Sequence, residues 1–139
     1  MTQPSKPGVA PPILNSVAPH LFVQNIHASC DFFTSKLGFT VDFVYGAPPF
    51  YAQVSRDNVK FALRHMDERV FAGDIREREE LVLASITVAT AEEIRDLFLL
   101  YQAAAVPFHQ ALKNEPWGAT TFTIRDPDGN LILFAGPAI

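Results

Sequence analysis

The feature that most constrains the fold is a pair of similar segments that lie about seventy residues apart. The earlier segment spans residues 54–63 and contains Arg-Asp-Asn, and the later one spans residues 119–134 and contains Arg-Asp-Pro-Asp-Gly-Asn. In both segments, residues that suit a half-buried strand flank residues that favour a turn. Such a repeat is typical of a chain built from two similar units, so we expect two halves with one plan.

The later segment predicts a β-hairpin with a defined turn. Pro127 presets φ for the second turn position, and the Asp126 side chain can accept hydrogen bonds from the backbone ahead. Gly129 supplies the positive φ that a three-residue loop with a bulge requires. Reading Asn58 of the earlier segment against Asn130 then places Phe61 at the position of Leu133.

Hydrophobic periodicity and turn signals predict the order β-α-β-β-β in each half. In the first half, the expected strands are 17–23, 39–45, 50–56 and 59–65, and the helix begins after Asn25 and ends at Gly38. In the second half, the expected strands are 81–88, 108–113, 119–125 and 131–134. The second helix begins at a capping box that starts with Thr90, and Pro107 prevents its continuation.

The expected domain organisation follows from these elements. Residues 1–12 form a flexible, proline-rich tail, 13–66 the first module, 67–80 a charged linker and 81–136 the second module. A loop that covers a site is the alternative for the linker. A chain of 139 residues accommodates both modules as one domain.

Composition restricts the class of protein. Apolar residues make up 48% and charged residues 19%, which is typical of a globular chain. A net charge of -4 without a basic cluster argues against a nucleic-acid partner. Cys30 is the single cysteine and no apolar run reaches membrane-spanning length, so we expect a soluble, cytoplasmic protein without a membrane partner.

A family resemblance rests on the duplication together with several short motifs. These are Phe22-Val23-Gln24-Asn25, Asp31-Phe32-Phe33, Leu37-Gly38-Phe39, Trp117-Gly118 and Asp126-Pro127-Asp128-Gly129-Asn130. With them the chain resembles the vicinal oxygen chelate superfamily of glyoxalase I, extradiol dioxygenases and bleomycin-resistance proteins, over roughly residues 13–136. The resemblance implies an α+β fold of two tandem βαβββ modules, whose curved mixed sheets form a cleft, and a homodimer.

The resemblance also implies where a metal would bind. In metal-using members, four ligands come from the first and last strand of each half, and these positions fall on Ala18, Phe61, Leu83 and Leu133. Divalent metals need imidazole, thiolate or carboxylate ligands, which these residues lack. The residues one position away lack them too. We therefore expect no metal, no cofactor and no catalytic residues of this type.

Histidines are the remaining candidates for chemistry. His20 and His65 lie on the same strand faces as Ala18 and Phe61, so we expect both to point toward the cleft. No carboxylate at a matching position completes a metal site, and hydrogen-bonded or solvated histidines are the simpler interpretation; a two-histidine metal site stays an alternative. The sequence contains no nucleophile elbow and no phosphate-binding glycine loop.

What remains is an apolar, aromatic cleft, which suits a planar organic ligand. Its expected ligand-binding residues are His20, Phe22, Tyr45, Phe50, Tyr51, Phe61, Leu63, His65, Leu83, His109, Trp117 and Leu133.

The sequence therefore favours a non-catalytic protein that binds and sequesters an aromatic, antibiotic-like compound without metal. The alternative is a glyoxalase-like lyase or isomerase, or a ring-cleaving dioxygenase. That enzyme would use an unrecognised metal site, or His20 or His65 as a base. A domain that mainly assembles with a partner protein is the third possibility.

Overall fold

The computed structural model describes residues 8, 10–69 and 73–139. The predicted flexible tail thus lies mostly outside the described residues, as do positions 70–72 of the predicted linker. In chain order, the elements are β1 (His20–Val23), α1 (Ile26–Ser35), β2 (Thr40–Tyr45), β3 (Tyr51–Arg56), β4 (Val59–His65), α2 (Ile75–Arg78), β5 (Val82–Thr87), α3 (Ala91–Ala103), β6 (Phe108–Asn114), β7 (Ala119–Arg125) and β8 (Leu131–Pro137).

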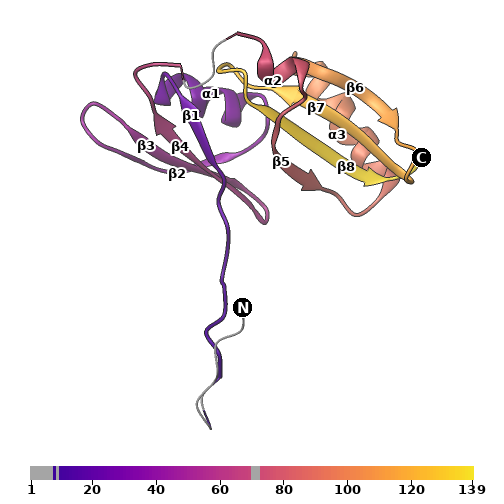
Figure 1. The fold of residues 1–139 in the computed structure, drawn as a ribbon, viewed down its shortest axis with the longest axis horizontal. Helices are drawn as coiled ribbons and strands as arrows, with labels where there is room; N and C mark the ends of the chain where they lie inside the picture. Colours follow the sequence, from indigo (N-terminus) through magenta and orange to yellow (C-terminus); the bar gives the residue numbers. More distant parts are fainter. Residues whose placement is uncertain (1–7, 9, 70–72) are drawn as a thin grey trace.

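The two modules have the same topology (Figure 1). The first forms a four-stranded sheet in the order β1-β4-β3-β2, and the second forms one in the order β5-β8-β7-β6. In each sheet the first strand pairs in parallel with the last strand, and the other pairs are antiparallel. The predicted duplication and the α+β class with mixed sheets are confirmed.

The two longer helices begin where the sequence predicts. The Asn25 side chain accepts a hydrogen bond from the Ala28 N–H at 2.9 Å, and the Thr90 hydroxyl accepts one from the Glu93 N–H at 3.1 Å. Each cap satisfies a backbone donor that would otherwise lack a partner in the first turn. No helix in the described ranges is long and apolar enough to cross a membrane.

The predicted hairpin turn between β7 and β8 is confirmed. The Asp126 carboxylate accepts hydrogen bonds from the N–H groups of Asp128 at 2.9 Å and Asn130 at 2.7 Å, and Gly129 has φ of +81°. The Asn130 side chain donates a third bond to this carboxylate. Burial outweighs these donors and raises the pKa of Asp126 to about 6.

Each sheet has one face covered by a helix, and the core lies between them. The ring of Phe33 on α1 lies 5.6 Å from that of Phe61 on β4. In the second module, Tyr101 on α3 lies 5.5 Å from Phe134 on β8, which stacks on Phe122 at 4.9 Å. All five rings are buried, and burial of each such side chain contributes about 2–3 kcal/mol.

Strand β1 is shorter than predicted at its start. It begins at His20, whereas the sequence predicted a strand from residue 17. Pro19 has no N–H to donate to the neighbouring strand. Its carbonyl still accepts a hydrogen bond from the Ala62 N–H at 2.9 Å. Ala18 therefore precedes the sheet.

The ladder register shows which positions of the two modules correspond. Leu21 and Ile86 each lie four residues before the capping residue of the following helix. Leu21 pairs with Leu63 across β1 and β4, and Ile86 pairs with Phe134 across β5 and β8. Leu63 therefore corresponds to Phe134.

This correspondence corrects the alignment made from the sequence. Ala62, and not Phe61, occupies the position of Leu133. The difference arises at the hairpin tips. In the first module, two residues (57–58) lie between the paired Arg56 and Val59, whereas in the second module three residues (127–129) lie between Asp126 and Asn130. A shift of one residue exchanges the two faces of a strand.

The predicted linker contains the short helix α2, which contacts the β7–β8 hairpin. Arg76 donates to the Asp128 carbonyl at 2.6 Å and to the Asn130 side-chain oxygen at 3.0 Å. Arg125 forms an ion pair with Glu77 at 2.8 Å. This part of the linker is thus attached to the second module.

The modules meet through the helix-covered sides of their sheets. The buried Tyr101 hydroxyl donates to the Leu37 carbonyl at 3.0 Å, and Arg56 donates to the same carbonyl at 2.7 Å. Lys36 donates to the Ala104 carbonyl at 2.8 Å. Burial raises the pKa of Tyr101, so the phenol stays protonated and remains a donor.

Substitution Tyr101→Phe should lower the free energy of unfolding by about 1–2 kcal/mol, because the hydroxyl loses its bond to the Leu37 carbonyl and its longer bond from Arg56, while the Leu37 carbonyl keeps Arg56 as donor. Urea denaturation followed by circular dichroism measures this. The matched control is Tyr45→Phe, whose ring is 64% exposed and whose loss of hydroxyl should leave stability unchanged. Equal stability of both variants would contradict a role for Tyr101 in joining the modules.

Candidate functional site

The face of the first sheet that α1 leaves uncovered carries rings and charges in rows across the strands. The ladder register places these side chains in two rows that run across the four strands, and we call the two rows together the aromatic face. The rows are Phe22, Arg64, Tyr51 and Tyr45, and then His20, Ala62, Gln53 and Phe43.

Tyr51 lies at the centre of the aromatic face. Its ring stacks with that of Phe43 at 5.8 Å with an interplanar angle of 27°, and the His20 ring lies 6.0 Å away on the other side. The Arg64 guanidinium lies over the Phe22 ring at 6.0 Å. Such an array offers stacking surfaces together with a cation held beside them.

A carboxylate lies next to these rings. A bulge in β2 follows Val41, and the Asp42 carboxylate accepts hydrogen bonds from the side chains of Gln53 and Ser55, both at 2.8 Å. These two bonds lower the pKa of Asp42, and the charge of Lys60 lowers it further. The negatively charged Asp42 thus lies beside the row that contains Gln53, and the positively charged Arg64 belongs to the row that contains Tyr51.

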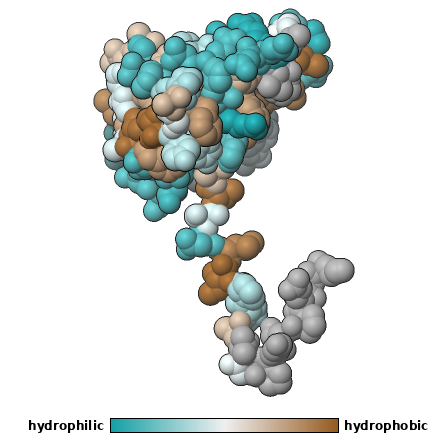
Figure 2. Space-filling view, turned by 90° about the vertical axis from the view of Figure 1, so that its left-hand side faces the viewer, coloured by the Kyte–Doolittle hydropathy of each residue, from teal (hydrophilic) through white to brown (hydrophobic). Residues whose placement is uncertain are grey.

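The aromatic face is largely open to solvent. Phe43 is 43% exposed and Tyr45 64% exposed, and the neighbouring Phe50 is exposed as well. Figure 2 shows apolar surface on this side of the molecule, surrounded by hydrophilic residues. A contiguous exposed apolar patch marks a surface that binds a ligand or another protein.

The structure brings five of the predicted residues together here. His20, Phe22, Tyr45 and Tyr51 lie on the aromatic face, and Phe50 packs edge-on against Tyr45 at 5.6 Å. The placement of His20, Phe22 and Tyr51 follows from the alternation of β1 and β3, which the sequence already predicts.

Three predicted residues of β4 lie elsewhere. Phe61 and Leu63 are 1% and 0% exposed and belong to the core beneath α1, so the expectation that they face the cleft is wrong. Their side of the strand was inferred through an alignment that is one residue out of register. His65 ends β4, and its Nε2 lies 3.0 Å from a carboxylate oxygen of Asp67.

The other predicted residues lie in the second module. Leu133 lies on the sheet face that α3 leaves uncovered, and Leu83, which is 41% exposed, lies at an irregularity of the neighbouring strand β5 between Val82 and Ala84. The Nε2 atom of His109 lies 3.5 Å from a carboxylate oxygen of Glu80, and Trp117 is 74% exposed in the turn before β7. Because the two sheets are separate parts of the chain (Figure 1), the twelve predicted residues do not form one site within it.

The residues at the implied metal positions do not fit a divalent metal. Ala18 precedes β1, Phe61 is in the core, and the corrected β4 position is Ala62. Leu133 does face the helix-free side, but neither it nor Leu83 carries a donor atom for a metal. Across residues 8, 10–69 and 73–139, no three His, Cys, Asp or Glu side chains gather in a way that could hold a metal ion.

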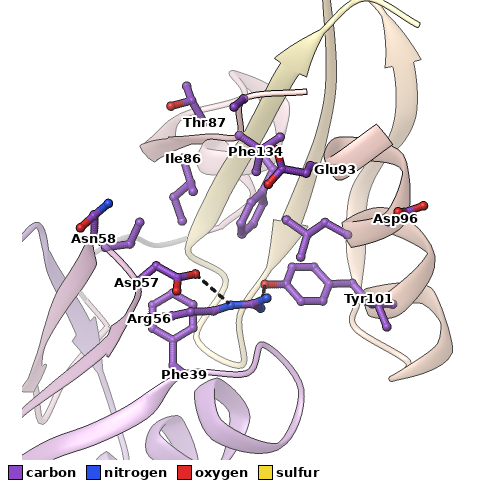
Figure 3. A pocket seen from close by; sticks show the side chains of 15 residues that line it. Phe39, Arg56, Asp57, Asn58, Ile86, Thr87, Glu93, Asp96, Tyr101 and Phe134 are labelled. Carbon is purple, nitrogen blue, oxygen red and sulfur yellow. Dashed lines mark hydrogen bonds and ion pairs between the residues drawn. The ribbon is translucent and has the colours of Figure 1, made fainter. Parts of the chain in front are cut away.

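A separate pocket lies between the modules, on the helix-covered side. Its volume is about 390 Å³, and Figure 3 shows the tip of the β3–β4 hairpin on one side and α3 on the other. Val59, Ile86 and Phe134 contribute apolar walls, and Arg56 reaches across to Tyr101 with a donor–acceptor distance of 3.3 Å.

Sequence reasoning missed several residues of both regions. Phe43 and Arg64 belong to the aromatic face, and alternation counted outward from Tyr51 would have identified Arg64 as its cross-strand partner. The bulge after Val41 hides Phe43, because it interrupts the period of two. The pocket between the modules has no local sequence signal, since it depends on how the two modules pack.

Comparisons with known proteins agree with this architecture. A model of the Glyoxalase/Bleomycin resistance protein/Dioxygenase superfamily matches residues 13–134. No curated protein matches the chain.

Three crystal structures illustrate the shared fold. A glyoxalase/bleomycin resistance protein/dioxygenase from Alicyclobacillus acidocaldarius has a TM-score of 0.71 at 17% identity, covering 88% of this chain and 91% of that one. The bleomycin-binding protein of Streptomyces verticillus, complexed with copper(II)-bleomycin, has a TM-score of 0.64 at 20% identity, covering 91% and 98%. A lactoylglutathione lyase from Agrobacterium tumefaciens has a TM-score of 0.66 at 17% identity, covering 91% of this chain and 95% of that one.

Because the helix-free faces lack a ligand set, purified protein should retain no stoichiometric metal. Dialysis against Zn²⁺, Ni²⁺, Mn²⁺ or anaerobic Fe²⁺, then against metal-free buffer, followed by elemental analysis, should give far less than one equivalent per chain. Retention of one equivalent would show that other residues, with His20 and His65 first in line, form a metal site.

Proposed function

Since the chain belongs to the glyoxalase/bleomycin resistance protein/dioxygenase superfamily, we propose that it binds and sequesters an aromatic small molecule without metal. The observation that carries this proposal is the exposed aromatic face, where Tyr51 lies between the rings of His20 and Phe43. No bond has to break. Protection follows when the reactive part of the ligand is buried.

The chemistry of the face defines the ligand class. A planar ring system can stack on Tyr51 and Phe43, and a polar substituent can bond to Arg64 within the face or to Asp42 beside it. The bleomycin-binding protein of Streptomyces verticillus supports this direction, because that protein has a similar fold and was crystallised with copper(II)-bleomycin.

We further infer that a second copy of the chain completes the site, giving a homodimer. The aromatic face is half-exposed in a single chain. The second module has Leu133 on its helix-free face, Leu83 exposed on β5 and Trp117 exposed in a turn. The segment before β1 extends away from the body (Figure 1), with Ile13 88% and Leu14 98% exposed. Burial of these groups against a partner chain would remove apolar surface from water.

In such a dimer, the helix-free face of the first module of one chain would meet the helix-free face of the second module of its partner, with the ligand between them. Predicted residues that lie apart within one chain would then belong to one site. We also place the protein in the cytoplasm, with the single buried Cys30 as support.

Titration with bleomycin and a panel of aromatic antibiotics should reveal a ligand that saturably changes the fluorescence of Trp117, the single tryptophan. Tyr51→Ala should weaken its binding by about 1–3 kcal/mol, because the central stacking surface is lost. Trp117→Ala, followed by calorimetry, should weaken it similarly if the indole stacks on the ligand. Leu99→Ala, on the exposed side of α3, serves as control. Unchanged affinity in a folded Tyr51→Ala protein would remove the aromatic face from the site.

Light scattering coupled to size exclusion should give twice the mass of one chain. Phe43→Lys should shift the protein toward a single chain at micromolar concentration, since a charge would then be buried in the interface. Leu99→Lys, a matched change on α3, should stay dimeric. A wild-type protein that elutes as a single chain at all concentrations would refute the inferred homodimer.

A further inference from the structure

The two modules approach each other through two related contacts, and one of them is incomplete. In each contact, the tip of one module's last hairpin reaches the loop between the first strand and first long helix of the other module. The tip at 126–130 reaches the loop before α1, and the tip at 56–59 reaches the loop before α3. We call the first contact the closed joint and the second the open joint.

Two hydrogen bonds fill the closed joint. The Gln24 N–H donates to the Asp128 carboxylate at 3.0 Å, and the Asn130 side-chain amide donates to the Phe22 carbonyl at 3.3 Å. The turn thus supplies an acceptor for the Gln24 N–H and a donor for the Phe22 carbonyl, two backbone groups that lie two residues apart.

The open joint presents the same backbone groups. Counting back from the helix caps, Ala89 corresponds to Gln24 and Thr87 to Phe22. Both Ala89 and Thr87 line the pocket of about 390 Å³. Their N–H and carbonyl are therefore the counterparts of the two groups that the closed joint satisfies.

The opposing hairpin tip cannot reproduce those bonds. Val59, which pairs with Arg56, occupies the position that Asn130, the partner of Asp126, occupies in the other hairpin. An apolar side chain therefore replaces the amide. The tip is also one residue shorter, and within the described residues no hydrogen bond joins Asp57 or Asn58 to the loop before α3. The pocket is the space that the longer turn fills in the closed joint.

We propose that the open joint binds a small apolar molecule that carries an uncharged carboxamide. The amide oxygen would accept from the Ala89 N–H, as the Asp128 carboxylate accepts from Gln24, and the amide nitrogen would donate to the Thr87 carbonyl. The apolar part fits against Val59 and Leu97, in a cavity large enough for a drug-sized fragment.

The charges around the pocket select against an anion. Asp57, Glu93 and Asp96 line the pocket, whereas Arg56 is the single cation among the described residues that line it and already donates to the Leu37 carbonyl. A carboxylate in place of the amide would face this negative field and could not donate to a carbonyl. The site lies on the helix-covered side of the first sheet, so it is separate from the aromatic face and independent of the function proposed above.

The test uses the ¹⁵N-labelled full chain and two probes of the same shape, 3-phenylpropanamide and 3-phenylpropanoate. The amide should produce saturable shifts of the Val88 and Ala89 resonances, with a dissociation constant in the millimolar range that is usual for fragments. The carboxylate should bind about tenfold more weakly or not at all.

Two adjacent leucines on α3 provide matched variants. Leu100 lines the pocket and Leu99 does not, while both side chains are at least half exposed, so both tolerate a larger residue. Leu100→Trp should fill the pocket and weaken amide binding about tenfold, and Leu99→Trp should leave it unchanged. A variant with Pro-Asp-Gly in place of Asp57-Asn58 together with Val59→Asn copies the closed joint and should abolish binding.

Several outcomes would overturn the proposal. These are an absence of shifts, equal binding of amide and carboxylate, shifts centred on Tyr51 and Phe43, or amide binding that persists in the Leu100→Trp protein. A change of oligomeric state in Leu100→Trp but not in Leu99→Trp would show that the pocket is an interface between copies of the chain. Among these outcomes, only shifts centred on Tyr51 and Phe43 would bear on ligand binding by the aromatic face, which Tyr51→Ala tests separately.

Discussion

One helix covers one face of each four-stranded sheet, and this constraint decides where every other feature lies. Phe33 on α1 and Tyr101 on α3 pack onto the rings of their own sheets, and the modules then meet through these helix-covered sides. Apolar burial is satisfied there, so the opposite faces are left for solvent, ligands or another chain. The aromatic face exists because the core needs only one side of the first sheet.

The contact between the modules shows how a small difference in a repeat creates a new surface. Both hairpin tips face an equivalent loop, but only the tip with Asp128 and Asn130 forms hydrogen bonds to it within the described residues. The other tip has one residue fewer, and Val59 takes the place of the amide. Arg56 and Tyr101 still hold the modules together at the Leu37 carbonyl, so the packing tolerates the pocket beside them.

Features encoded by neighbouring residues were predictable from the sequence. The cap at Asn25 and the turn at Asp126 and Gly129 depend on side chains within a few residues, and both are confirmed. Register between the modules is different, because it depends on the length of each turn. Matching Asn58 with Asn130 follows residue identity, yet it placed the buried Phe61 and Leu63 in the site. Placements counted within one strand, such as His20 and Tyr51, did not depend on that alignment.

Strand β4 connects the two candidate sites through its alternation. Val59 lines the open joint and Phe61 supports the core beneath α1, whereas Ala62 and Arg64 belong to the aromatic face on the other side. Adjacent residues of one strand therefore act on opposite surfaces, and a substitution in one set leaves the side chains of the other in place. Two binding surfaces on one sheet can thus differ in ligand preference independently, as long as the turn at 57–58 keeps the strand in register.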